Sequence, residues 1–334
     1  MHGLADAWLR EILTSFGGYD GAVTEFIRVT DSLLPRRSFY RVAPELRNRG
    51  CTAGGTPTAV QLLGSDPHFL AINAVRLARL GPAAVDLNFG CPAPTVNRHR
   101  GGAVLLDEPE LIHRITAAVR RAVPRHVAVT AKMRLGVRDT GRAVECVQAL
   151  AEAGSQSIVV HARTRDDMYK PPARWEWLGR LREAVATPVI ANGEVWTVAD
   201  WQAIRAESGC ADVMLGRGAV ADPLLARKIR AAQGELPPVE DGWAEIQPVI
   251  GHFWRGVEER VLPQHAPGRL KLWLGLLCRG YPEGAALQAA VKPQRRSEDV
   301  RRVLAEAGIE VPPATVLSLS EQPPSEKEEH EHPD

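Results

Sequence analysis

Short apolar runs rich in β-branched residues recur through the first two-thirds of the chain. Gly, Pro and Asn, which favour turns, separate them from the rest of the sequence. Seven such runs lie at residues 21–29, 58–64, 83–90, 127–135, 157–163, 188–194 and 212–218. Most gaps between them show helical periodicity, as in DPHFLAINAVRLARLG and EPELIHRITAAVRRAV. Strands that alternate with helices in this way predict βαβ units and a parallel sheet.

Nearly every predicted strand ends in a polar or glycine-rich cluster. The side chains at these ends include Gln61, Asn88, Lys132, Arg134, His161, Asn192, Glu194 and Arg217. Polar groups at the carboxyl ends of many parallel strands are typical of a (β/α)8 barrel, whereas a doubly wound sheet concentrates them at one or two switch points. The predicted fold is therefore an α/β TIM barrel. Because a closed barrel of this kind needs eight strands, the count of seven means that one strand is overlooked or that the first is missing from this chain.

The pattern changes after about residue 222, where the remaining apolar segments all have helical spacing. We expect the barrel at 1–230, a small helical domain at 235–312 and a disordered acidic tail at 313–334. Residues 321–334 carry six acidic residues and one lysine, a net charge of −5. The chain as a whole carries +1, so the remainder carries +6, which is compatible with an anionic partner.

Composition narrows the class of protein. Hydrophobic residues make up 45% of the chain and charged residues 24%, as in ordinary globular proteins. No apolar run is long enough to span a membrane, and the N-terminal segment is interpreted as a helix, not a signal peptide. The five cysteines form no CxxC pair, so we expect reduced thiols in a cytoplasmic protein and no metal site.

The last two predicted strands end in the tripeptides NGE, at 192–194, and GRG, at 216–218. Loops at these two positions of a barrel commonly bind a phosphate through backbone N–H groups and a helix N-terminus. The alternative is that the glycines are only turn residues. Arg217 adds a permanent positive charge, which favours an anion-binding site.

Three other strand-end side chains suit an electron-rich cofactor. Lys132 points into the predicted barrel mouth and could stabilise the negative charge of a reduced flavin, although a structural ion pair would also explain it. Gln61 has both the donor and the acceptor that a pyrimidine edge requires, or it is a plain strand end. His161 could donate a hydrogen bond when neutral or act as a counter-ion when charged.

Cys91 lies on a loop that follows the strand at 83–90. A buried cysteine usually acts as a small apolar residue, but a position between Gly90 and Pro92 offers no such packing role. Its thiol is therefore a candidate acid or nucleophile. The loop continues through the basic residues 98–100 to two glycines, a composition typical of a lid that brings an acid to a bound substrate.

Several segments, in order and at matching spacing, resemble the flavin-dependent tRNA-dihydrouridine synthases. They are TEFIRVTDSLLP, VQLLG, VDLNFGCPAPTVN with GGAVLL, AKMRLG, VVHARTR followed by a tyrosine, PVIANGEVW and VMLGRGA. The resemblance runs from about residue 1 to residue 230. The segment GRLKLWLGLL at 268–277 extends it and resembles the bacterial branch that modifies U16 of the tRNA D-loop.

The resemblance implies that U16 in tRNA is reduced to 5,6-dihydrouridine, with FMN as cofactor and NADPH as reductant. It implies that FMN is bound by Met1, Gln61, Lys132, His161, Asn192, Gly193, Glu194, Gly216 and Arg217. Cys91 would be the general acid. The inserted uridine or its neighbours would be contacted by Arg28, Asn88 and Arg134, and the tRNA phosphates by Arg269, Lys271 and Lys292. The target base must leave its stack to reach a barrel mouth. We expect a monomer with no membrane association.

One departure concerns the start of the sequence. Family members begin with a strand that ends in APMEG, and its backbone cradles the flavin ring. Met1, His2 and Gly3 align with the last three positions of that motif only, which agrees with the count of seven strands. This departure leaves open a tRNA-binding protein that has lost flavin and catalysis. A separate alternative is a barrel flavoenzyme that acts on a free pyrimidine or enone.

Overall fold

The barrel domain is built on a single parallel sheet. The computed structural model describes residues 4–240 and 242–313. The strands are β1 (Ala22–Val23), β2 (Ile27–Arg28), β3 (Thr58–Leu63), β4 (Ala84–Phe89), β5 (Ala128–Arg134), β6 (Ile158–His161), β7 (Val189–Asn192) and β8 (Val213–Met214). Both β1 and β2 pair with β3, and from β3 the order follows the chain to β8. All pairings are parallel, so the seven predicted strand regions are confirmed, the first of them divided into β1 and β2.

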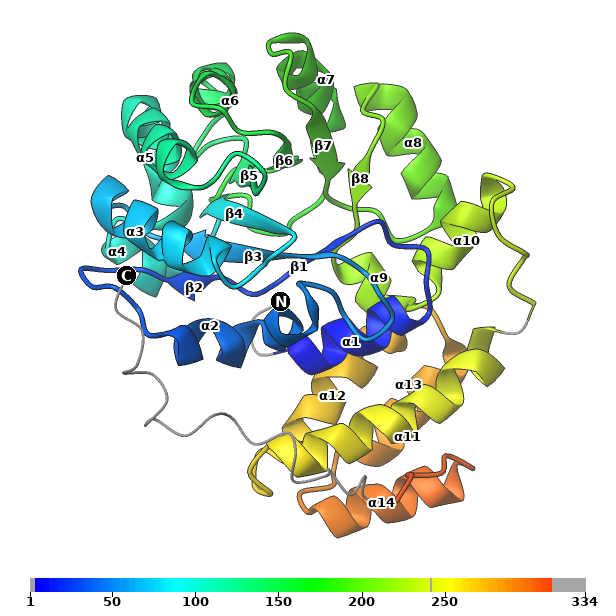
Figure 1. Cartoon of the computed structure of the whole chain (residues 1–334). Helices are drawn as coiled ribbons and strands as arrows, with labels where there is room; N and C mark the ends of the chain where they lie inside the picture. Colours follow the sequence, from blue (N-terminus) through cyan, green and yellow to red (C-terminus); the bar gives the residue numbers. More distant parts are fainter. Residues whose placement is uncertain (1–3, 241, 314–334) are drawn as a thin grey trace.

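Helices cover the outer side of the curved sheet and form a separate group below it (Figure 1). They are α1 (Ala7–Ser15), α2 (Arg36–Val42), α3 (Pro67–Ala78), α4 (Pro94–Arg98), α5 (Pro109–Ala122), α6 (Ala143–Glu152), α7 (Trp175–Glu183), α8 (Val198–Ser208), α9 (Arg217–Ala221), α10 (Leu225–Ala232), α11 (Gly242–Arg260), α12 (Ala266–Leu277), α13 (Pro282–Val291) and α14 (Ser297–Glu306). Short 3-10 helices cover Pro44–Asn48 and Gly102–Asp107. The alternation of strand and helix from β3 to α8 is the α/β TIM-barrel arrangement that the sequence predicts.

The sheet is open at one side. Within residues 4–240 and 242–313, the hydrogen-bonded path runs from β1 to β8, and no pairing joins these two end strands. Met1, predicted to bind the cofactor, lies outside the described residues, as does the predicted acidic tail from residue 314 onward. No helix in the described part of the chain has the length and apolar character of a membrane span.

The buried apolar residues form two separate hydrophobic cores. The first lies between the sheet and its covering helices and includes Val85, Val129 and Val160. The second contains apolar residues of α11 to α14 together with Leu9 and Ile12 of α1. The sequence assigned α1 to the barrel, yet its apolar face packs into the core of the helical domain.

Helix α1 therefore joins the two parts of the molecule. Its Trp8 donates an indole hydrogen bond to the carbonyl of Phe253 on α11, 3.1 Å away. On its other side, Arg10 donates to the carboxylate of Glu45 at 2.6 Å and pairs with Glu25 at 2.9 Å. Glu25 and Glu45 lie near β1, β2 and the adjacent 3-10 helix, so α1 fixes the helical domain against the open side of the sheet.

Candidate active site

The carboxyl ends of the strands bring the predicted site residues together. In the strand register Asn88 lies opposite Lys132, and Arg134 lies opposite His161. His161 in turn lies opposite Asn192. Because the strands are parallel and neighbouring, residues that are up to 104 positions apart in sequence meet at one edge of the sheet.

Lys132 is held at the centre of this edge. Its Nζ donates a hydrogen bond to Oδ1 of Asn192 at 3.0 Å, and the Nδ2 of Asn192 donates to the carbonyl of Met214 at 2.8 Å. Burial lowers the pKa of Lys132 to about 8, helped by the charge of Arg134 and opposed by that of Asp86. The ammonium is therefore still largely protonated at neutral pH, but it has lost most of its solvation.

His161 lies among cations. Its pKa is held well below the ordinary range, first by burial and then by Lys132, Arg134, Arg163 and Arg217. This environment favours the neutral imidazole. It therefore favours His161 as a hydrogen-bonding group over His161 as a charged counter-ion.

Arg163 is the positive charge that lies beside His161 and is fully buried. One of its Nη atoms is 3.5 Å from Nε2 of His161, and the other pairs with the carboxylate of Glu194. Glu194 also accepts a hydrogen bond from the indole of Trp196 at 2.8 Å. Its carboxylate is thus engaged by protein groups on both oxygens.

The chain comes close to His161 at Gly193. This glycine has a φ of +126°, and a Cβ atom there would lie 3.0 Å from Cδ2 of His161. Its carbonyl accepts a hydrogen bond from the indole of Trp175 at 2.9 Å. Glycine is therefore required here both by the backbone conformation and by the close approach, which goes beyond a simple turn role.

Arg217 begins α9 and is held by aromatic rings. Its guanidinium carbon lies 4.6 Å from the ring centre of Tyr169 and 5.1 Å from that of Trp196. Arg279, which follows α12, stacks on Trp196 at 4.1 Å. Among the described residues Arg217 has no carboxylate partner, so its charge is available to an anion.

The loop of Cys91 is more tightly held than its sequence suggests. Oδ1 of Asn88 accepts hydrogen bonds from the backbone N–H groups of Gly90 and Cys91, each at 2.9 Å. The carbonyl of Cys91 accepts from Nδ2 of Asn97 at 2.8 Å. Gly102, with a φ of +68°, packs so closely that an added Cβ would lie 2.7 Å from that carbonyl. Cys91 itself is half-buried, and residues 98–100 at the tip of the loop are exposed.

The thiol of Cys91 has the protonation state of an acid. Burial raises its pKa above the ordinary value, while a backbone hydrogen bond from Ala93 and the charge of Arg134 oppose the rise. Arg134 also donates to the carbonyl of Gly90 at 3.0 Å and to the carbonyls of Thr164 and Met168 at 2.8 and 2.9 Å. It thus ties the Cys91 loop to the loop after β6.

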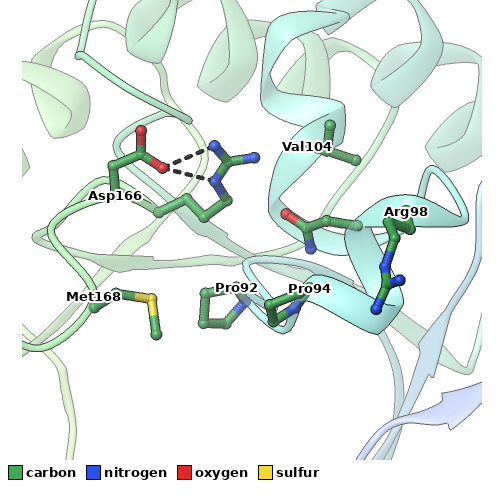
Figure 2. A pocket seen from close by; sticks show the side chains of 8 residues that line it. Pro92, Pro94, Arg98, Val104, Asp166 and Met168 are labelled. Carbon is green, nitrogen blue, oxygen red and sulfur yellow. Dashed lines mark hydrogen bonds and ion pairs between the residues drawn. The ribbon is translucent and has the colours of Figure 1, made fainter.

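A cavity of about 600 Å³ opens between these two loops (Figure 2). It is lined by Pro92, Pro94, Asn97, Arg98, Val104, Arg165, Asp166 and Met168. Arg165 and Asp166 pair with each other across 2.8 Å on its wall, and Arg98 lies on the opposite side. Its volume is in the range of small-ligand sites.

The site geometry can now be compared with known proteins. A family model described as dihydrouridine synthase (Dus) matches residues 1–264. The chain belongs to the dihydrouridine synthase family. It is 55% identical over 304 residues to the tRNA-dihydrouridine(16) synthase of Cupriavidus necator, which covers 91% of this chain and 94% of that protein. It is 53% identical over 307 residues to the tRNA-dihydrouridine(16) synthase of Ralstonia nicotianae, with 92% and 94% covered.

Solved structures of other proteins share the fold of this chain. The 6-hydroxypseudooxynicotine amine oxidase of Pseudomonas geniculata superposes with a TM-score of 0.53 at 14% identity, over 67% of this chain and 44% of that one. Histamine dehydrogenase from Rhizobium superposes with a TM-score of 0.52 at 16% identity, over 75% and 45%. At these identities the likeness concerns the barrel architecture alone.

The residues predicted to contact tRNA differ in how accessible they are in this family member. Arg28 on β2 and Lys292 at the end of α13 are exposed. Lys271 donates a hydrogen bond to the carbonyl of Gln294. Arg269 is mostly buried, paired with Asp6 and bonded to the carbonyl of Leu4 at 3.1 Å. Its guanidinium is thus already engaged within the protein.

Several residues at this site have no role predicted from the sequence. They are Asp86, Thr130, Arg163, Tyr169, Trp196 and Arg279. Asp86 lies two positions from Asn88 on β4, so the two-residue period of a strand puts it on the same face and could have identified it. Arg163 lies two positions after His161, beyond the end of β6, where this period no longer applies. Tyr169, Trp196 and Arg279 lie in loops, where no periodicity points to them.

Proposed function

We propose that the chain reduces the uridine at position 16 of tRNA to 5,6-dihydrouridine, with FMN as cofactor and NADPH as reductant. Support comes from the names of relatives that are 53–55% identical and of which 94% is covered by this chain. The observation that carries the proposal is the half-buried thiol of Cys91, on a loop bound by Arg134, which is one of the cations around His161 at the carboxyl edge of the sheet.

The residues of this edge fit an anionic flavin. Lys132 makes one hydrogen bond within the described residues, to Asn192, and its other N–H groups remain for a ligand. Arg217 offers a charge that no carboxylate among these residues neutralises, close to Gly216 and suited to a phosphate. In this proposal Gln61, His161 and Asn192 to Glu194 complete the cofactor-binding set.

Reduction of the uracil C5–C6 bond requires a hydride at C6 and a proton at C5. Bound FMN, once reduced, supplies the hydride. Cys91 supplies the proton, because its raised pKa keeps the thiol protonated at neutral pH. Lys132 stabilises negative charge on the cofactor. Neutral His161 offers a hydrogen bond without adding another positive charge to the site.

The tRNA partner is proposed to lie across the sheet edge and the helical domain. Arg28 and Lys292 offer exposed charges, and Lys271 donates to the carbonyl of Gln294, two residues after Lys292. The cavity beside Arg98 has room for a nucleotide next to the target. Asn88, Arg134 and Arg269 already donate hydrogen bonds to protein groups. In this proposal they contact tRNA through the N–H groups that these bonds leave free. A monomer suffices because one chain provides the whole site, and the cytoplasm is the proposed compartment.

The alternative of a tRNA-binding protein without flavin makes a different prediction about the purified protein. The proposal expects a yellow protein with the visible absorbance of oxidised flavin, and dihydrouridine at position 16 in tRNA incubated with it and NADPH. A colourless protein that takes up no FMN would contradict the cofactor. Dihydrouridine at another D-loop position would contradict the choice of uridine but leave the reaction intact.

A further inference from the structure

A chain of hydrogen-bonded side chains lies directly beneath the Cys91 loop. Asp86, on β4, is 5% exposed and accepts a hydrogen bond from the hydroxyl of Thr130 at 2.6 Å and another from Nε2 of Gln61 at 2.6 Å. Oε1 of Gln61 accepts from Nδ2 of Asn88 at 2.6 Å. The three strands β3, β4 and β5 therefore share one connected polar network.

The network continues into the loop through the other end of Asn88. Since Nδ2 of Asn88 is directed to Gln61, its Oδ1 faces the loop and accepts the backbone N–H groups of Gly90 and Cys91. An Asn88 turned the other way would present its NH₂ group to two N–H donors and would lose both bonds. The position of Cys91 thus depends on which way two amide side chains are turned.

The carboxylate of Asp86 decides that orientation. An ionised carboxylate can only accept hydrogen bonds, so the amide of Gln61 must turn its NH₂ group toward Asp86 and its oxygen toward Asn88. Burial raises the pKa of Asp86, and the hydrogen bonds from Thr130 and Gln61 and the charge of Lys132 act against this rise. In the structure both carboxylate oxygens accept a hydrogen bond, one from Thr130 and one from Gln61, and this arrangement sets the direction of every bond up to the loop.

We propose that Asp86 is a positioning residue for Cys91, which acts through Gln61 and Asn88 to hold the loop with the thiol in place for proton transfer. The proposal rests on the role of Cys91 given above, but the placement of the loop can be measured without tRNA or reductant. It adds to Gln61 a second task besides any cofactor contact, because both ends of its amide are engaged within the protein.

The substitution Asp86→Asn separates shape from hydrogen-bond direction. Asparagine has nearly the same volume, and the hydroxyl of Thr130 can accept as well as donate. An amide at position 86 can, however, face Gln61 with either its oxygen or its NH₂ group. The turned arrangement becomes accessible in Asp86→Asn, and with it a loop that lacks the bonds from Asn88.

The experiment measures alkylation of Cys91 by iodoacetamide in the purified full-length protein, followed peptide by peptide with mass spectrometry. Loss of about one net hydrogen bond predicts a rise in the Cys91 rate of about fivefold in Asp86→Asn. The half-buried Cys278 in the same molecule serves as internal reference and should not change. In turnover, kcat should fall while KM for tRNA stays the same.

Asp222→Asn is a matched control, since Asp222 is another buried carboxylate, bonded to Tyr281 and Lys228 far from the loop. It should leave the Cys91 rate unchanged. An unchanged Cys91 rate in Asp86→Asn would overturn the proposal, and so would an equal rise at Cys278 or an equal effect of Asp222→Asn.

A second variant keeps the test decisive if Asp86→Asn folds poorly. Gln61→Met has similar length but cuts the network between Asp86 and Asn88, so it should raise Cys91 alkylation to a similar extent. The double variant should be no faster than either single variant, because both interrupt one path. Additive effects would overturn the proposal. Full activity of Cys91→Ala would instead refute the role of Cys91 as the acid. It would not bear on the Cys91 alkylation rates measured in the Asp86 and Gln61 variants.

Discussion

Lys132 on β5 and Asn192 on β7 are joined by a hydrogen bond of 3.0 Å that passes across the end of β6. The bond places a largely buried ammonium between strands that are not neighbours in the sheet. The burial that lowers its pKa to about 8 makes the charged form costly in the folded protein. A negatively charged cofactor bound at this position would offset the free energy that burial of the ammonium costs.

The first prediction concerns the pH dependence of stability in flavin-free protein. Lys132 has a folded pKa of about 8, below the ordinary 10.5, so between these values the unfolded chain binds more protons than the folded one. This residue therefore makes the free energy of unfolding rise as pH increases through that window, by up to about 3 kcal/mol. Urea denaturation of natural protein and Lys132→Met at several pH values measures it. A stability difference that stays constant with pH would refute the lowered pKa.

The second prediction concerns the proposed acid. Cys91→Ala should retain flavin and tRNA binding but lose nearly all dihydrouridine formation, because no other group supplies the proton. The loss should be about a hundredfold or more in kcat, as for other general acids. Cys278→Ser is the control, since that thiol bonds to the carbonyl of Gly275 within the helical domain. Undiminished turnover by Cys91→Ala would remove Cys91 from its role.

The third prediction concerns the tRNA surface. Lys292 is exposed at the end of α13, so Lys292→Ala should weaken tRNA binding and reduce the salt dependence by about one counterion. Arg125 is equally exposed but lies before β5, at the amino edge of the sheet. Arg125→Ala should therefore leave the affinity unchanged. Equal effects of the two substitutions, measured by titration at two salt concentrations, would contradict this placement of tRNA.

The fourth prediction concerns the contact between α1 and α11. A Cβ atom at Gly256 would lie 2.2 Å from the ring of Trp8, so Gly256→Ala should destabilise the protein by about 1–3 kcal/mol. Gly268 on α12 has no neighbour within 4 Å, and Gly268→Ala should leave stability unchanged or raise it by up to about 1 kcal/mol. Thermal unfolding compares the two. Equal stability of both variants would mean that α1 is not packed as described.

Much of the fold is legible in the sequence because a parallel sheet buries both faces of each strand. Runs such as 83–90 and 127–135 are rich in apolar residues, with polar residues only at alternate positions, and are easy to recognise. The core against which α1 packs could not be predicted in this way. Its spacing shows that it has an apolar face, but periodicity carries no information about which core receives that face, and Leu9 and Ile12 pack with α11 to α14.

The sequence also predicts that the strand-end residues lie together, because the carboxyl ends of parallel strands meet at one edge of the sheet. What could not be predicted is which partner each group takes. Arg269 looks like a free charge in the sequence, yet it is paired with Asp6, more than 260 residues away. The role of Asp86 could not be predicted either, because it is a single acidic residue inside an apolar strand. Only the structure shows that it is connected to Gln61 and Asn88.

The bond between Trp8 and Phe253 spans 245 residues and has a consequence for biosynthesis. Helix α1 leaves the ribosome before its packing partners on α11 to α14 have been synthesised. The nascent barrel must therefore be made while Leu9 and Ile12 are still uncovered, and only translation of the C-terminal helices shelters them.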